Sequence, residues 1–250
     1  RSYFENSELA ATGLPSAAEV ALLTPYRNSL AGEIFTQSYA PPTADGSGRL
    51  RGNNRTARRL LAQAGWRIKD LKLRHEGGGK AFRFEIMLLR RGNVKLALHL
   101  ARNLEKLGID VEVRLVDTAQ YQQRTNTFDF DAIFHAWEPS LSPGNEQAFY
   151  WGSEAARQPG SRNYPGIRVP AVDALIQKIS DAPDRASLVT AVRAMDRILQ
   201  WGHYVIPLFH LKADRVALWD KFGRPEQMPL YGYRLETWWA DASRMEGNRK

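Results

Sequence analysis

The residues best suited to chemistry lie in one long polar stretch, which follows an apolar run at 128–137 and ends near residue 167. Carboxylate, amide, hydroxyl and guanidinium groups alternate there with large aromatic rings. Loops longer than about 15 residues inside compact domains tend to be functional or disordered, and disordered segments are poor in aromatic residues. The stretch therefore predicts a binding surface. The alternative is an ordered loop that merely covers an edge of a sheet.

Ten residues of this stretch are candidates for ligand binding. Amides can hydrogen-bond a peptide main chain whatever its sequence, a carboxylate can meet its ammonium end, and rings can cover varied side chains. No activated nucleophile accompanies them, so the pattern favours binding without turnover. The candidates are Trp137, Glu138, Ser140, Asn145, Glu146, Gln147, Trp151, Arg162, Asn163 and Tyr164.

Asp129 and Asp131 are the best pair of carboxylates for a hydrolase. Two residues apart on a strand, they share one face at roughly 6–7 Å, which suits acid and base roles. They stand at the start of the predicted strand, however, whereas ligands in open α/β sheets bind beyond the carboxyl ends. Ion pairing with nearby basic side chains is the preferred interpretation, and a carboxylate-based hydrolase is kept as an alternative.

Other catalytic signatures are missing from the sequence. Gly46 and Gly48 have the wrong spacing for a dinucleotide turn, and Lys80, after three glycines, precedes Ala81 where a phosphate-binding loop needs Ser or Thr. The five histidines include no His-Glu-x-x-His pair, and there is no cysteine for a thiolate or a cysteine-ligated metal. We therefore expect neither a metal nor another cofactor.

The net charge of +8 is concentrated in one segment. Residues 49–95 contain 14 Lys or Arg against three acids. This pattern can indicate a nucleic-acid-binding module, but no nucleic-acid motif or unbroken basic run accompanies it. A solvated basic face is the preferred interpretation, and nucleic acid remains an alternative partner.

Hydrophobic periodicity predicts an α/β fold. Residues 82–88 alternate as in a strand, a helix follows from Asn93 to Gly108, and residues 109–115 alternate again. This strand, helix, strand succession predicts a crossover with parallel strands. The run at 128–137 predicts a further strand near the sheet centre, so that Glu138 leaves the sheet where a ligand site is expected.

The rest of the chain gives coarser predictions. We expect short helices at 17–23 and 118–125, a helix from Asn53, capped by that residue, to Ala64, and core helices at 170–182 and 184–201. Strands are expected at 204–211 and 215–219. The segment 223–250 is rich in aromatic residues and too short to bury them against itself, so we expect it to dock elsewhere.

Ordered motifs along nearly the whole chain resemble a known family. The most specific are Ser142–Gln147 and Gly160–Tyr164. The remaining matches are Tyr3–Pro15, Asp45–Gly48, Leu60–Trp66, Asn103–Ile109, Val116–Tyr121, Phe128–Asp131, Tyr150–Ser153, Pro170–Ile176 and Tyr204–Pro207. Together they resemble the extracellular solute-binding proteins of peptide-type ABC importers, family 5, and in particular the oligopeptide and microcin C branch.

The resemblance covers the C-terminal part of such proteins, and with a first residue other than Met it suggests a piece of a longer chain. It implies a lobe like those of type II periplasmic binding proteins, with a mixed, mostly parallel sheet flanked by helices. Residues 1–222 would form the ligand-binding lobe, and 223–250 would pack on a missing N-terminal lobe. It also implies a peptide or peptide-like ligand, a periplasmic location, an inner-membrane ABC permease as partner and no catalysis. Relatives hold the ligand's ammonium group with an Asp after the central strand, where this chain has Glu138 or Ser140.

The sequence also bears on membrane insertion and nucleic acid. No apolar run approaches the roughly 20 residues that a helix needs to cross a bilayer, so we expect no membrane-spanning segment. The resemblance adds no nucleic-acid partner.

Overall fold

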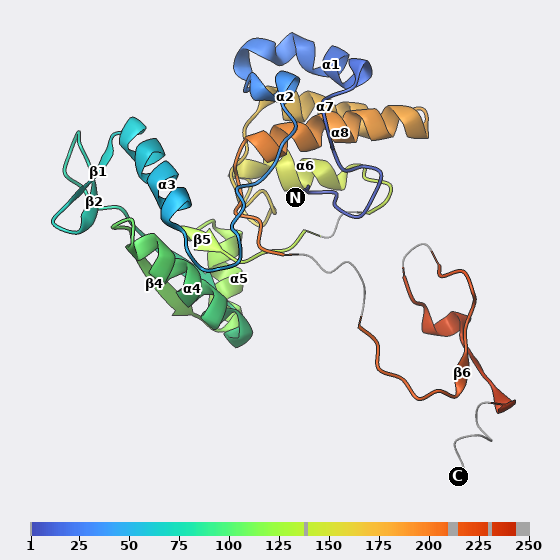
Figure 1. Ribbon diagram of the computed structural model, residues 1–250. Helices are drawn as coiled ribbons and strands as arrows, with labels where there is room; N and C mark the ends of the chain where they lie inside the picture. Colours follow the sequence, from blue (N-terminus) through green and yellow to red (C-terminus); the bar gives the residue numbers. More distant parts are fainter. Residues whose placement is uncertain (1, 138–139, 210–214, 230–231, 244–250) are drawn as a thin grey trace. The chain divides into compact units, whose positions relative to one another are not determined.

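The structure is a computed structural model that describes residues 2–137, 140–209, 215–229 and 232–243 (Figure 1). The chain divides by its contacts into two compact units, 1–206 and 207–250. The expected boundary at 222 and 223 concerns the whole protein and stays a prediction. No helix in the described ranges is long and apolar enough to cross a membrane.

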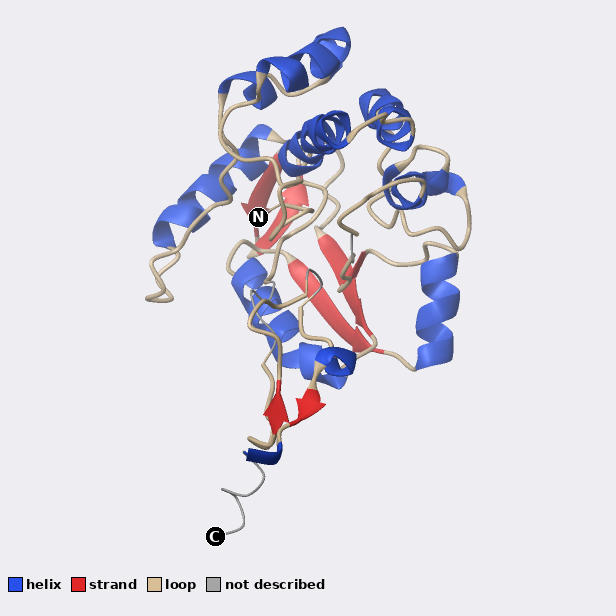
Figure 2. Cartoon of the chain, turned by 90° about the vertical axis from the view of Figure 1, so that its right-hand side faces the viewer, coloured by secondary structure: helices blue, strands red, loops and turns tan. Residues whose placement is uncertain are grey.

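The first unit contains a three-stranded parallel sheet in the order β4-β3-β5. Its strands are β3 (Arg83–Leu88), β4 (Asp110–Leu115) and β5 (Ala132–Ile133). Figure 2 draws the strands in red. The helix α4 (Val94–Glu105) connects β3 to β4 and packs against β4, and the two strands pair in parallel over their whole lengths. This confirms the predicted strand, helix, strand unit, in which the alternating residues Ile86 and Leu88 are buried.

The prediction of a long central strand at 128–137 is wrong. The strand covers only Ala132 and Ile133, and β3 lies between β4 and β5 in the described part of the sheet. Phe128 has a φ of 56°, a left-handed conformation that interrupts an extended strand. The main-chain N–H of Asp129 then donates to the carbonyl of Arg124 at the end of α5 (Thr118–Asn126), so the chain is still turning where the apolar run begins.

A helix and a hairpin form a second, smaller layer of packing. The helix α3 (Arg51–Gln63) contacts the antiparallel hairpin of β1 (Trp66–Lys69) and β2 (Lys72–His75) (Figure 1). Their shared core is Leu73, with Ala57 and Leu61 of the helix packed against it. The expected cap at Asn53 is wrong, because the helix begins earlier and Asn53 donates its side-chain amide to the carbonyl of Thr43.

The largest core lies among helices. It joins α6 (Glu146–Trp151), α7 (Pro170–Ser180) and α8 (Arg185–Trp201) to the N-terminal segment with α1 (Ala17–Leu23) and α2 (Glu33–Thr36). The expected inward residues of α7 and α8 are buried or packed on this core. The described residues of this unit also form short 3-10 helices at Thr24–Ser29, Arg91–Asn93 and Ala155–Arg157.

Two buried charges of α8 hold the N-terminal segment. The Asp196 carboxylate accepts hydrogen bonds from the N–H groups of Tyr3 and Ala11 at 3.0 and 2.8 Å. Arg197 pairs with Glu19 at 2.5 Å and donates to three carbonyls of the same segment, at residues 12–14. Hydrophobic periodicity did not predict these anchors.

The second unit contains the short strands β6 (Phe222–Gly223) and β7 (Trp239–Ala240) and a 3-10 helix at Leu235–Thr237. Strands predicted at 204–211 and 215–219 are not formed in the described residues 204–209 and 215–219, and the turn at 213 and 214 lies outside the described residues. Extended, β-prone residues become a strand only where a neighbouring strand supplies hydrogen bonds. Phe209 and Trp219 are 77% and 78% exposed.

Candidate functional site

Three of the predicted residues meet in a row of aromatic rings. The ring of His135 lies between those of Trp137 and Tyr164, with centroids 4.7 and 4.8 Å away. Behind Trp137, the ring of Trp151 lies at 4.9 Å, and Tyr164 is also packed edge-on to Phe130 at 5.9 Å. The row runs from the end of the parallel sheet to the helical core. Its partly exposed rings form a surface suited to stacking on a ligand.

Beside this row, the segment 160–167 has an alternating orientation. Ser161 and Asn163 are buried, whereas Arg162 is exposed and Tyr164 is partly exposed. The side-chain amide of Asn163 donates to the carbonyls of Gly152 and Ile167 and accepts from the N–H of Ile167, each at 2.9 Å. Asn163 therefore acts as an internal brace, and the brace fixes the backbone from which Arg162 and Tyr164 project.

Arg162 joins this segment to the aromatic row. Its carbonyl accepts a hydrogen bond from the indole Nε1 of Trp137 at 3.4 Å, and its N–H donates to the carbonyl of Phe149 in α6. The Arg162 side chain is exposed, and its charge lies close enough to His135 and Tyr164 to favour a lower pKa in both. A cation of this kind can bind a carboxylate with two parallel hydrogen bonds.

The structure places two further candidates inside the protein. Gln147 and Trp151 are 1% and 2% exposed, one turn apart on α6. The indole Nε1 of Trp151 donates to Oε1 of Gln147 at 3.1 Å. Their polar groups bond to each other and to the protein, so they support the surface from below. The sequence alone does not distinguish these two residues from ligand-facing ones, because it does not show which side of a loop or short helix faces solvent.

The other candidates lie along the connection into α6. Asn145 accepts a hydrogen bond from the hydroxyl of Ser180 at 2.7 Å, and both carboxylate oxygens of Glu146 accept from the N–H of Gly144. Ser140 is exposed and accepts from the N–H of Ser142. Glu138 lies outside the described residues. In the described part of the chain, no hydrogen bond or ion pair joins Ser140, Asn145 or Glu146 directly to a ring of the aromatic row. Glu146 is linked to it indirectly, since it accepts from the amide of Gln147, which bonds to Trp151.

His135 lies in this aromatic row but is not among the ten candidates predicted from the sequence, in which the histidines were considered only as metal ligands. It stands two residues before Trp137, and that spacing could have suggested a shared face. Burial and the nearby positive charge of Arg162 lower the pKa of His135 to about 4. The ring is therefore neutral at physiological pH, so it can accept or donate a hydrogen bond without adding charge.

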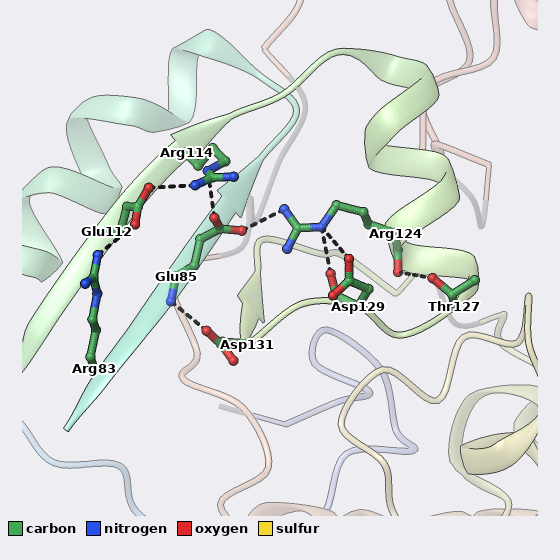
Figure 3. A network of polar contacts seen from close by, with 8 residues as sticks. All are labelled: Arg83, Glu85, Glu112, Arg114, Arg124, Thr127, Asp129 and Asp131. Carbon is green, nitrogen blue, oxygen red and sulfur yellow. Dashed lines mark hydrogen bonds and ion pairs between the residues drawn. The ribbon is translucent and has the colours of Figure 1, made fainter. Parts of the chain in front are cut away.

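The two aspartates proposed for hydrolysis belong to a charge network on the sheet (Figure 3). Asp129 pairs with Arg124 at 3.1 Å, and Arg124 also pairs with Glu85 at 2.8 Å. Asp131 accepts a hydrogen bond from the N–H of Glu85 at 2.9 Å. The preferred interpretation of ion pairing is confirmed for Asp129, whereas Asp131 bonds to the main chain. Among the described residues, no group of three or more His, Asp or Glu could hold a metal.

The fold defines the class of protein. The chain is similar to the oligopeptide-binding protein AppA from Bacillus subtilis, solved with a nonapeptide, at a TM-score of 0.58 and 18% identity, over 90% of this chain and 45% of that one. This likeness shows the fold, that of type II periplasmic binding proteins. The expected α/β class, with a parallel sheet flanked by helices, is confirmed.

The sequence comparison then identifies the family. Residues 22–158 match the bacterial extracellular solute-binding proteins, family 5 Middle, and the chain belongs to this family. Two curated relatives come from Agrobacterium fabrum: the probable peptide-binding protein YejA and the peptidoglycan-binding protein YepA. They are 39% and 38% identical over 96% of this chain. The chain spans 39% of the length of each relative.

Family membership favours binding over catalysis. The matched family is that of extracellular solute-binding proteins, and the two named relatives are described as binding proteins. The chain therefore belongs to a family of binding proteins and not of enzymes. The alternatives of a carboxylate-based hydrolase and a nucleic-acid-binding module are not favoured.

Proposed function

We propose that the chain is the C-terminal lobe of a periplasmic binding protein that captures oligopeptides or peptide-like compounds and delivers them to an inner-membrane ABC permease. The observation that carries the proposal is the surface of Trp137, His135, Tyr164 and Arg162, supported from below by Asn163. Rings tolerate varied side chains, and a guanidinium group can bind the terminal carboxylate of a peptide. The names of YejA and YepA support a peptide-containing ligand.

The proposal narrows the ten candidate residues to those that can reach a ligand. Trp137, Arg162 and Tyr164 form the primary surface. Ser140, Asn145 and Glu146 belong to the connection that follows, and Glu138 is kept from sequence alone as a candidate anchor for an ammonium group. Gln147, Trp151 and Asn163 act as supports, because their polar atoms already bond to the protein. The microcin C branch remains a prediction from the sequence motifs.

The test uses the full-length protein, because we expect the isolated lobe to bind peptides only weakly without the contacts and water exclusion of its partner lobe. Calorimetry with a peptide pool, followed by mass spectrometry of the bound fraction, would identify ligands. We expect Arg162→Gln to weaken binding of the selected peptide about 10- to 100-fold, since it removes a charge-assisted hydrogen bond.

Arg168→Gln is the matched control, because Arg168 is an exposed arginine a few residues further along the same segment. We expect its affinity to equal that of the wild type. A C-terminally amidated peptide separates the possible roles: if Arg162 binds the terminal carboxylate, amidation should weaken the wild type and leave Arg162→Gln unchanged. Equal affinities of both arginine variants and the wild type would contradict the assignment of this surface.

The second unit carries the proposal about the missing lobe. Within 223–250, the exposed apolar side chains of the described residues include Met228, Leu235 and Trp239, and the chain covers well under half of the length of its relatives. We propose that the 223–250 segment packs on the N-terminal lobe of the same protein. Amide hydrogen exchange in this segment should be slower in the full-length protein than in the 250-residue chain, and equal rates would argue against the packing.

A further inference from the structure

The hairpin of β1 and β2 has two faces of opposite character. Trp66 and Ile68 share one face with their partners Leu73 and His75, and Leu73 is 2% exposed in the core beneath α3. The other face presents cations only. Its residues are Arg67 and Lys69 on β1 with Lys72 and Arg74 on β2.

These four cations stand directly opposite one another in two pairs, Arg67 with Arg74 and Lys69 with Lys72. Like charges at directly opposed positions destabilise a strand pair. Glu76 pairs with Arg67, and Arg74 donates to the carbonyl of Gly79 at 2.8 Å, which offsets part of the repulsion. In the described part of the chain the two lysines form no ion pair. The hairpin therefore keeps a net positive charge, since Asp70 and Glu76 are its two acids against four cations.

The turn between the lysines places a leucine at the tip. Asp70 and Leu71 form a two-residue connection with φ of 51° and 63°. Such turns favour Asn, Asp or Gly, because other side chains are strained at positive φ. Leu71 is nevertheless 90% exposed. A leucine held in an unfavourable conformation and projected into solvent between two lysines suggests a contact made outside this chain.

We propose that this hairpin docks on the surface of an anionic lipid bilayer. Leu71 would enter the boundary between headgroups and acyl chains, and Lys69 and Lys72 would lie among the headgroups. Arg67 and Arg74 stand two residues further along the strands, about 7 Å away at the usual strand rise. A headgroup layer is about 5–8 Å thick, so both cation pairs fit within it.

A lipid surface fits these residues better than an acidic protein pocket. Protein anchors are usually aromatic or Arg side chains within a large buried interface, whereas the turn offers a single leucine next to Asp70, flanked by Lys69 and Lys72. One apolar anchor with surrounding cations suits a fluid anionic surface, where aliphatic stems bury and ammonium groups stay hydrated. The inference is independent of the peptide site.

The test is sedimentation of the 250-residue chain with vesicles of phosphatidylglycerol in phosphatidylcholine, compared with pure phosphatidylcholine, at physiological ionic strength. We expect co-sedimentation with the anionic vesicles alone. Lys69→Gln with Lys72→Gln should weaken partitioning about 30-fold, at about 1 kcal/mol for each charge near the surface. Leu71→Asn should weaken it roughly tenfold.

Two controls keep the result interpretable. Leu71→Asn should fold at least as well as the wild type by thermal melting, because Asn tolerates positive φ. Lys95→Gln with Lys178→Gln removes two exposed charges elsewhere on the first unit and should leave partitioning unchanged. Absence of enrichment on anionic vesicles would overturn the proposal, as would equal losses for both lysine pairs or an unaffected Leu71→Asn. The first of these outcomes would leave an acidic protein surface as the candidate partner.

Discussion

Neighbouring side chains in the segment 161–164 have separable roles. Asn163 bonds three buried main-chain groups, whereas Arg162 projects from the backbone that those bonds fix. A sequence without a structure cannot show this alternation, since Arg and Asn are both common in ligand sites. Whether such a residue faces solvent or braces the backbone depends on the direction of its side chain and not on its residue type.

Asn163→Ala should lower the free energy of unfolding by about 3 kcal/mol, because three buried main-chain groups lose their partner at about 1 kcal/mol each. Urea unfolding of the 250-residue chain measures the change. Arg162→Ala should alter stability by less than about 0.5 kcal/mol, as expected for an exposed side chain. If the two variants were equally stable, Asn163 would not be the brace that its contacts indicate.

At the scale of elements, the sequence predicted correctly those helices and strands that have a clear hydrophobic period and a residue that ends them. The units β3, α4 and β4 and the helices α7 and α8 follow clear periods of 2 and 3.6 with a Gly, Pro or Asp at their ends. The strand predicted at 128–137 does not begin at Phe128, which adopts a positive φ, and the chain pairs with β3 only at Ala132 and Ile133. The strands predicted after residue 203 are not formed in the described residues. Residue types can favour an extended backbone, but they do not show whether a neighbouring strand is present to pair with it.

The helix α8 shows how long-range polar contacts escape prediction. Arg197 is 2% exposed and pairs with the buried Glu19 across 178 residues of sequence. Hydrophobic periodicity predicted α8 as an ordinary core helix, because periodicity takes only the apolar positions into account. The anchors of the N-terminal segment became visible only with the fold.

Arg197→Ala should destabilise the first unit by about 3–5 kcal/mol, because it leaves the Glu19 carboxylate buried without its partner. Arg193→Ala is the control on the same helix. It removes one hydrogen bond, to the carbonyl of Glu8, and should cost about 1 kcal/mol. Differential scanning calorimetry compares the two, and a similar loss for both would contradict a dominant role for the buried pair.

For the whole molecule, stability should respond to two groups whose pKa shifts act in opposite directions. The pKa of His135 falls to about 4, so the unfolded chain binds more protons between about pH 4 and 6.5, and this group makes stability rise with pH there. Burial raises the pKa of Asp196 from 3.8 to about 6. The folded chain therefore binds more protons over that range, and this group makes stability fall as pH rises.

Variants should separate the two contributions. With His135→Gln, the excess stability of the wild type over the variant should grow as pH rises from 4 to 6.5. With Asp196→Asn, that excess should shrink as pH rises from about 4 to 6. Denaturant titrations across this range measure the slopes, and parallel curves for the wild type and either variant would refute the corresponding shift.

The alternation of residues 161–164 also separates what natural variation can change from what it must keep. Under the proposed function, substitutions at Arg162 and Tyr164 would change ligand preference while the buried residues Ser161 and Asn163 keep the backbone in place. Related proteins could therefore differ in ligand preference through substitutions at these two positions alone. A laboratory library restricted to the same two positions should consist of folded variants.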